Sequence, residues 1–201
     1  MSAIFNAANE LKIYEVTIGG IKFTKELVLS FEMAYECHTP VIKGELLFKD
    51  LYDMNDQIDW NEAEVEVKYL DIFDQEVKRK FKILSIDEYL DEMFEKHTTL
   101  KLQDEISYKI SRCVKSKSFT GNIVTCLNAY LDDLKITEIE RDFTESDKEV
   151  NFAVPQNVNH LDWLMFELKK YGFTLYQTKT KIHLKSIEDI LPSALPCLLY
   201  T

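Results

Sequence analysis

The chain has 201 residues, of which 46% are hydrophobic and 12% aromatic, and it contains only five glycines and four prolines. This composition is typical of an ordered globular protein of one or two small domains, and it excludes a disordered or collagen-like chain. The formal net charge of −11 opposes binding to a phosphate backbone over a general surface, so sequence-specific recognition of nucleic acid is not expected.

The chain ends and the cysteines indicate where the protein is made. No run approaches the ~20 apolar residues of a membrane span. The start, MSAIFNAANELK, lacks the basic residues and apolar core of a signal peptide, so we expect a chain kept in the cytosol. No CxxC pair occurs, which argues against a zinc site or redox motif and favours free thiols. The cysteines are Cys37, Cys113, Cys126 and Cys197.

The first hundred residues predict a series of short β-strands. Lys12–Ile18 ends at Gly19 and Gly20, which permit a tight turn, and Ile21–Thr24 returns from it. The strongest period-two alternation of the sequence follows and is stopped by Pro40. The side chains expected on the buried face of this strand are Leu27, Leu29, Phe31, Met33 and Tyr35.

Three more strands are predicted before residue 86. Val41–Phe48 is the first, with apolar side chains on both faces. Ala63–Tyr69 and Val77–Ser85 follow, and the segment Asp71–Asp74 turns the chain between them. Because Glu alternates along the first of these two strands and Lys along the second, we expect a hairpin in which an acidic face lies opposite a basic one.

The end of this β-rich region is less regular. Ile86–Lys96 is acidic and is expected to form a loop or short helix, and Thr98–Leu102 restarts a strand. This gives six or seven strands between residues 12 and 103 with few helical signals among them. An antiparallel barrel or sandwich over residues 1–105 is therefore predicted.

Residues 106–190 are expected to form a small α+β domain. Ser107–Ser118 is basic and polar. The spacing of Ile123, Leu127, Tyr130, Leu131 and Leu134 then predicts a helix, with Thr120 as its N-cap. Thr137–Lys148 is acidic and expected to be a loop.

The best-specified helix of the chain follows Asn159, which can cap it. Lysines 169 and 170 fall in its last turn, and Gly172 comes directly after, as the helix dipole and the usual capping pattern favour. Residues 191–201 form an apolar C-terminal tail. The other strands predicted in this domain are Val150–Val154, Thr174–Gln177 and Lys181–Lys185.

No catalytic, cofactor-binding or metal site is predicted. The histidines His38, His97, His160 and His183 lie one to a segment with no HExxH or His-to-Cys spacing, and no GxSxG, GxGxxG or Walker loop occurs. The first carboxylate cluster lacks the glycine and terminal Glu of a calcium loop, and abundance alone does not give a glycosidase its facing pair of acids. The two clusters are Asp50, Asp53, Asp56 and Asp59, and Glu88, Asp91, Glu92 and Glu95.

The remaining conspicuous residues have structural interpretations. Trp60 and Trp163 are expected to anchor a core or an interface. The basic clusters are expected to be a solvated strand face and a charged linker. They consist of Lys78, Arg79, Lys80 and Lys82, and of Arg112, Lys115 and Lys117.

The order of the predicted elements resembles one known family. The stretches that carry the resemblance are VTIGGIKFTKELVLSFEMAYE, VIKGELLFKDLYD and VEVKYLDIFDQEVKRKFKILSID, followed by SFTGNIVTCLNAYL and VPQNVNHLDWLMFELKKYGFTLYQ. Over residues 12–187 they resemble the phage baseplate hub family, which includes the hub of T-even phages and the N-terminal part of VgrG proteins. The fold class that this resemblance implies is α+β, an N-terminal antiparallel β-barrel of the tail-tube type followed by a small α/β domain.

The resemblance implies a structural virion protein without cofactor, a hub component that connects the tail tube to the central spike after assembly in the host cytoplasm. The implied partners are further copies of the chain in a ring, trimer or hexamer, the tube protein and the spike protein. DNA is expected only to pass through the lumen, and no stable membrane insertion is expected. Hubs of this family carry a second barrel; the chain ends at Thr201, so we expect that barrel in another chain or lost by truncation.

Two alternatives stay open at this point. One is an enzyme, a cell-wall hydrolase associated with a tail. The other is a hub-like module of a contractile secretion system.

Overall fold

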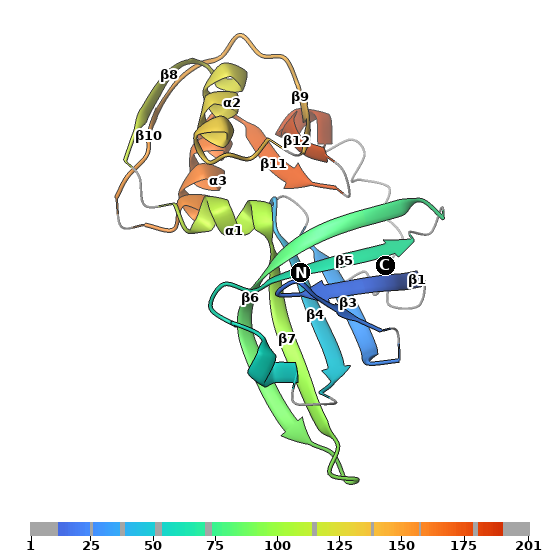
Figure 1. Ribbon diagram of the computed structural model, residues 1–201. Helices are drawn as coiled ribbons and strands as arrows, with labels where there is room; N and C mark the ends of the chain where they lie inside the picture. Colours follow the sequence, from blue (N-terminus) through green and yellow to red (C-terminus); the bar gives the residue numbers. More distant parts are fainter. Residues whose placement is uncertain are drawn as a thin grey trace. The chain divides into compact units, whose positions relative to one another are not determined.

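The computed structural model describes residues 12–24, 26–36, 39–50, 54–70, 74–113, 116–137, 139–156, 158–178 and 181–190. The described residues form two compact units (Figure 1). The first contains the residues up to Tyr35 and from Val41 to Glu105, and the second contains the residues that follow Glu105. Within the described part of the chain, no helix has the length and apolar character that crossing a bilayer requires. The tail 191–201 and the residues Cys37, His38, Asp53, Lys115 and Cys197 lie outside the described residues.

The first unit is one seven-stranded antiparallel sheet that curls on itself (Figure 1). The strands lie side by side in the order β2-β1-β5-β6-β7-β4-β3. They are β1 (Lys12–Ile18), β2 (Ile21–Phe23), β3 (Val28–Tyr35), β4 (Ile42–Lys49), β5 (Glu64–Leu70), β6 (Glu76–Leu90) and β7 (Lys96–Asp104), with a short 3-10 helix, η1 (Met54–Gln57), before β5. The predicted count of six or seven strands and the barrel-type architecture are confirmed.

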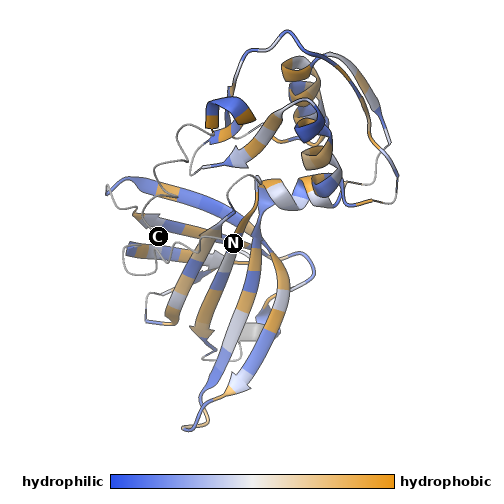
Figure 2. Ribbon diagram, turned by 180° about the vertical axis from the view of Figure 1, so that it is seen from behind, coloured by the Kyte–Doolittle hydropathy of each residue, from blue (hydrophilic) through white to orange (hydrophobic). Residues whose placement is uncertain are grey.

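The core of this unit is built by alternation along the central strands. Every second side chain of β4 and β5 is buried, as the period-two pattern predicts. Figure 2 shows hydrophobic and hydrophilic residues alternating along strands of this sheet. Phe81 of β6 is fully buried and meets the ring of Phe31 edge-on, with centroids 5.7 Å apart. At Gly44 an added Cβ would lie 3.4 Å from both Leu102 and Phe31. The absence of a side chain at this position therefore leaves room for these two side chains to pack close to the backbone of β4.

The predicted hairpin with opposed charges is confirmed in β5 and β6. Glu64 is the register partner of Lys82 and Glu66 that of Lys80. The Nζ atom of Lys82 lies 2.6 Å from a carboxylate oxygen of Glu64. Each such exposed pair contributes only about 0–1 kcal/mol, so this face sets the register and solubility more than the stability.

Two details of the basic and apolar faces differ from the prediction. Arg79 is buried on the inner face, with its guanidinium 5.9 Å from the ring centre of Tyr35, because it alternates with Lys78 and Lys80 along β6. In β3 only Phe31 of the five expected side chains is fully buried, and Leu29 is 43% exposed. This strand is an edge of the sheet with a register shift near its start, so one of its faces is only partly covered.

The prediction of a loop or short helix at Ile86–Lys96 is wrong. β6 continues to Leu90 and β7 begins at Lys96, so that the two strands form one long hairpin whose turn is residues 91–95. The register shifts between Ile83 and Ser85, and side chains from Asp87 onward are exposed on both faces of β6. A strand with water on both faces shows no period-two alternation, and this explains the missed element.

The second unit combines two small sheets with three helices. Strands β8 and β10 pair antiparallel, and a three-stranded sheet has the order β11-β12-β9 with β9 parallel to β12. The elements are α1 (Glu105–Ser111), β8 (Ser118–Asn122), α2 (Ile123–Asp133), β9 (Glu140–Phe143), β10 (Glu149–Ala153), α3 (His160–Lys170), β11 (Phe173–Gln177) and β12 (Lys181–Ser186).

Helix α3 forms as predicted. The side chain of Asn159 accepts a hydrogen bond from the backbone N–H of Leu161 at 3.0 Å, and Gly172 adopts the positive φ of +79° that ends the helix. The predicted cap of α2 is wrong, because Thr120 lies within β8. Asn122 takes that role and accepts from the N–H of Val124 at 2.9 Å.

Two segments without a predicted helix or strand contain elements. Ser107–Ser118, which the sequence marks only as basic and polar, begins within α1, whose Ser107 and Ile110 are buried. Thr137–Lys148, which was expected to be a loop, contains β9. None of the side chains of β9 is fully buried, whereas the partner strand β12 buries Ile182 and Leu184, so the sequence of β9 shows no apolar alternation.

Replacing Phe81 with alanine should lower the free energy of unfolding of the first unit by about 3–5 kcal/mol, because it leaves a cavity against Phe31. Chemical denaturation followed by circular dichroism measures this change. Phe94→Ala is the matched control, since that ring is exposed and its removal should cost less than about 0.5 kcal/mol. Equal losses in the two variants would contradict this placement of the core.

Candidate assembly surface

The curled sheet has two edges at which a strand lacks a second neighbouring strand among the described residues. β2 pairs only with Val16–Ile18, at the end of β1, so Lys12–Glu15 of β1 has no strand on that side among the described residues. On the other edge, β3 pairs with β4 alone in the described sheet. The free N–H and C=O groups of such edges favour pairing with another chain unless something covers them.

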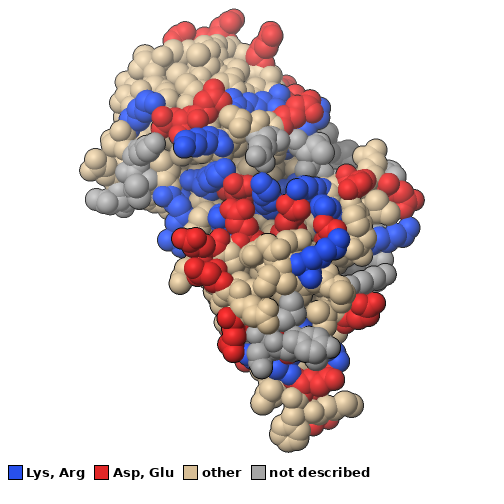
Figure 3. Space-filling model, viewed as in Figure 1, with Lys and Arg blue, Asp and Glu red and all other residues tan. Residues whose placement is uncertain are grey.

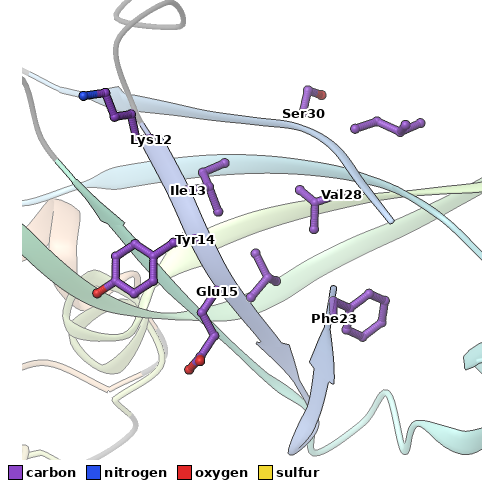
Figure 4. A pocket seen from close by; sticks show the side chains of 9 residues that line it. Lys12, Ile13, Tyr14, Glu15, Phe23, Val28 and Ser30 are labelled. Carbon is purple, nitrogen blue, oxygen red and sulfur yellow. The ribbon is translucent and has the colours of Figure 1, made fainter. Parts of the chain in front are cut away.

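A hollow of about 330 Å³ lies between these two edges. Figure 4 shows Ile13 of β1 and Val28 of β3 on opposite sides of it, with Phe23 of β2 at one end. Leu29, which is partly exposed, also lines the hollow, as does the polar Ser30. The hollow is therefore lined by both apolar and polar side chains and lies between strand edges that can form hydrogen bonds.

The charged rim of the hollow is fixed by ion pairs. Glu15 accepts hydrogen bonds from the ammonium groups of Lys22 and Lys68, the second at 2.5 Å, and these bonds lower the pKa of Glu15 to about 2. A hydrogen bond with Glu76, burial and the charges of Glu76 and Glu15 raise the pKa of Tyr14 to about 12. At neutral pH, Glu15 is thus an ionised carboxylate whose charge is balanced by the two lysines, and Tyr14 is an uncharged phenol.

Among the described residues of the first unit, the tip of the long hairpin carries the most exposed apolar side chains. Met93 and Phe94 are 81% and 83% exposed, and Leu90 beside them is also exposed. In Figure 3 the end of this hairpin shows mostly uncharged atoms, whereas acidic and basic residues are interleaved across the middle of that face. Large apolar side chains grouped in this way mark interaction sites more often than inert surface.

The turn that carries these side chains is braced. The carboxylate of Asp91 accepts hydrogen bonds from the N–H groups of Met93 and Glu95, each at 2.8 Å, and the Phe94 N–H donates to the Asp91 carbonyl at 3.0 Å. Phe94 has a φ of +62°, a conformation that costs a bulky residue on the order of 1–3 kcal/mol. The hydrogen bonds of Asp91 therefore hold an aromatic ring outward against a conformational cost.

Asp91, Glu95 and His97 also gather their ligand-type atoms within 4.8 Å of one another, a convergence that the sequence analysis missed. His97 Nε2 lies 3.1 Å from Asp91, and its ring stacks on Tyr89. Hydrogen bonds from the Glu95 N–H and from His97 lower the pKa of Asp91. Lys49 binds Glu95, so the acids of this group already have partners within the chain, as suits a braced turn.

The sequence spacing of Asp91, Glu95 and His97 was the signal from which this convergence could have been predicted. Positions i, i+4 and i+6 come together when two strands meet at a five-residue turn, but they separate in the loop or helix that was expected there. The three donor types are those of a divalent-cation site, and any cation there has to displace Lys49 and the backbone donors.

The other singled-out histidines and acids lie apart. His160 is buried and its Nε2 lies 3.0 Å from the carbonyl oxygen of Pro155. His183 lies between Asp142, at 2.8 Å, and Thr178, at 3.0 Å, and so ties β12 to β9 and to the end of β11.

The first acidic cluster does not converge in the described residues. Asp50 is buried and lies 3.2 Å from the ammonium of Lys96, whereas Asp56 and Asp59 are exposed. Trp163 packs near the rings of Phe152 and Tyr130, at 6.1 Å from each, as expected of a core anchor.

Comparisons with known proteins were informative only for structures. No family model matches the chain, and no curated protein does. A chain of the Francisella PdpA–VgrG complex matches with a TM-score of 0.55 and 12% identity over 94% of this chain and 34% of its own. The tail protein from Neisseria meningitidis MC58 matches with a TM-score of 0.58 and 9% identity, over 87% of this chain and 50% of its own. The 43 kDa tail protein of prophage MuSo2 from Shewanella oneidensis gives 0.58 and 12%, over 87% and 53%.

The fold is that of phage tail and VgrG-like proteins. The α+β fold class and the family resemblance drawn from the order of elements are thereby confirmed at the level of architecture. At 9–12% identity the likeness concerns the fold alone, and the chain spans about a third to a half of the length of these structures.

The carboxyl group of Glu15 should titrate at about pH 2 in the folded protein. Because this lies below the ~4.3 of an unfolded glutamate, the pair stabilises the fold above about pH 4.5, and that contribution is lost as the pH falls towards 2. A carbon-13 NMR titration of the side-chain carboxyl measures this pKa. Lys68→Ala should raise it and Lys43→Ala, on an exposed position of β4, should not; a wild-type value of about 4 would refute the pairing.

Proposed function

We propose that the chain is a structural component of a phage-type tail or baseplate, which acts by assembling with other subunits and not by catalysis. The observation that carries the proposal is the open curled sheet, in which β3 and part of β1 lack a second neighbouring strand among the described residues and the hairpin tip is exposed, in a fold shared with tail proteins. Unpaired strand edges and a cluster of exposed apolar side chains are features that a subunit buries on assembly.

Within that role the chain acts as a hub component between the tail tube and the central spike. Its partners are further copies of itself in a ring, the tube protein and the spike protein, and its location is the virion, reached by assembly in the host cytoplasm. The net charge of −11 suits a lumen through which DNA passes without being retained. Residues 1–105 and 106–190 serve as two domains in this scheme, and a module of a contractile secretion system is the alternative setting.

The hydrolase alternative has less support. A retaining glycosidase holds two acids about 5–5.5 Å apart across a cleft, and an inverting one about 6.5–9.5 Å. The residues that line the hollow include one carboxylate, Glu15, and two lysines hold it. That arrangement favours a neutralised structural group over an acid–base pair.

Reconstitution with the neighbouring proteins tests the proposal. The purified chain is mixed with the tube and spike proteins of the same tail, and complexes are detected by native mass spectrometry and negative-stain electron microscopy. We expect defined oligomers that bind at least one of the two neighbours. A monomer that binds neither, or one that clears a suspension of cell walls, would refute the structural role.

A further inference from the structure

Strand β9 is held in the second unit in a different way from the other strands of its sheet. It lies at the edge of the three-stranded sheet and pairs, in parallel, with β12 alone among the described strands (Figure 1). None of its side chains is fully buried, whereas β11 and β12 bury Leu175, Ile182 and Leu184 completely. We propose that β9 is a strap, held by charged side chains, that detaches from β12 while the core of the unit stays folded.

Two acids of β9 hold it to β12. A carboxylate oxygen of Glu140 lies 2.7 Å from the ammonium of Lys181. The carboxylate of Asp142 lies 2.8 Å from Nδ1 of His183 and 3.0 Å from the ammonium of Lys185. Hydrogen bonds from Lys185 and His183 lower the pKa of Asp142. The bond with Glu140 raises the pKa of Lys181, so at neutral pH the ammonium of Lys181 and the carboxylate of Asp142 are both charged.

The residue between these acids holds β9 to helix α2. The guanidinium of Arg141 donates hydrogen bonds to Oδ1 of Asn128 at 2.9 Å and to the carboxylate of Asp132 at 2.6 Å. It also donates to the carbonyl oxygen of Ile136, just after the helix, at 2.7 Å. Because successive side chains of a strand point to opposite faces, β9 is tied by ion pairs to β12 and by a charged hydrogen-bond fork to α2.

The chain is anchored on both sides of β9. Before the strand, Ile136 is buried and its N–H donates to the carbonyl oxygen of Leu131 at 3.0 Å. After it, the N–H of Ile123 donates to the carbonyl oxygen of Lys148 at 3.0 Å. The described residues between 137 and 148 bury no side chain. Release of β9 therefore removes no side chain from the core, and this is the condition for an opening that costs less than unfolding the unit.

Ionic strength separates the contribution of charge from that of burial. The side chains of Glu140 and Asp142 are 63% and 43% exposed, so their ion pairs are open to screening by salt. The screening length falls from about 10 Å at 0.1 M salt to about 3 Å at 1 M. The pairing of β11 with β12 instead joins strands with buried apolar side chains. Salt should therefore loosen one edge of the same sheet and leave the other in place.

Amide hydrogen exchange of the full chain, followed by NMR, tests the proposal. The N–H of Thr144 donates to the carbonyl oxygen of Leu184 at 2.9 Å and reports on the release of β9. The amides of β11 report on the rest of the sheet. An increase in NaCl from about 0.1 M to about 1 M should speed exchange of the Thr144 amide at least about fivefold relative to the β11 amides. Exchange of Thr144 that is no faster than that of β11, or an equal response to salt, would overturn the strap.

A charge-neutralising variant tests whether ion pairs hold the strand. The double variant Glu140→Gln, Asp142→Asn removes both negative charges with little change in size. At low salt its Thr144 amide should exchange at least about fivefold faster than in the wild type, and its response to salt should fall by at least about half. The β11 amides and the thermal midpoint should stay close to the wild-type values.

Glu167→Gln is the matched control, because it removes an ion pair with Lys170 on the surface of α3. It should leave the exchange of Thr144 and its salt response unchanged. Acceleration of β11 as large as that of Thr144 in the double variant would mean that the whole unit opens, and a retained salt response would mean that charge does not hold β9. Either result refutes the proposal. The measurement uses the unassembled chain, so its outcome is independent of the proposed role in a tail.

Discussion

Among the described residues, β3 and the first half of β1 have a paired strand on one side only, because the seven-stranded sheet curls without closing. A closed barrel satisfies every strand, whereas an open curl leaves two edges whose polar groups need water or another chain. The apolar side chains that would fill a closed seam instead line a hollow between those edges. The strand edges and the hollow follow from this incomplete closure. The exposed hairpin tip belongs to β6 and β7, in the middle of the sheet order.

The same constraint explains how stability and exposure are divided. The central strands β4 and β5 and the first half of β6 bury most of their apolar side chains, and aromatic pairs such as Phe31 with Phe81 fill the curl. β3, which has only one neighbour, leaves Leu29 partly exposed. The edge strands therefore contribute some side chains to the core, such as Phe31, and leave others, such as Leu29, partly exposed.

Sequence patterns predicted the parts of the fold in which one face is dry and the other wet. Ala63–Tyr69 and the helix after Asn159 are examples, because period-two or period-3.6 alternation and capping residues record such burial directly. The far half of β6 and strand β9 were missed, since neither buries one face of its own against a core. Asn122 was overlooked as a cap because Thr120, two positions earlier, offers a similar side chain.

The candidate surface was less predictable than the fold. Nothing in the sequence marks the opening between β1 and β3, because it depends on which strands fail to pair. The Asp91 turn could have been recognised only after the hairpin was, since its carboxylate braces backbone groups two and four residues away. Long-range pairing and local turn geometry are the information that composition and periodicity do not contain.

Amide hydrogen–deuterium exchange as a function of protein concentration tests the central claim most directly, because it reports on unpaired edges and on the tip in one experiment. Our account predicts that the amides of residues 12–15, 28–30 and 91–95 exchange quickly in dilute protein and become protected together as concentration rises. Protection of these edges already in the dilute monomer, or no change at any concentration, would contradict it.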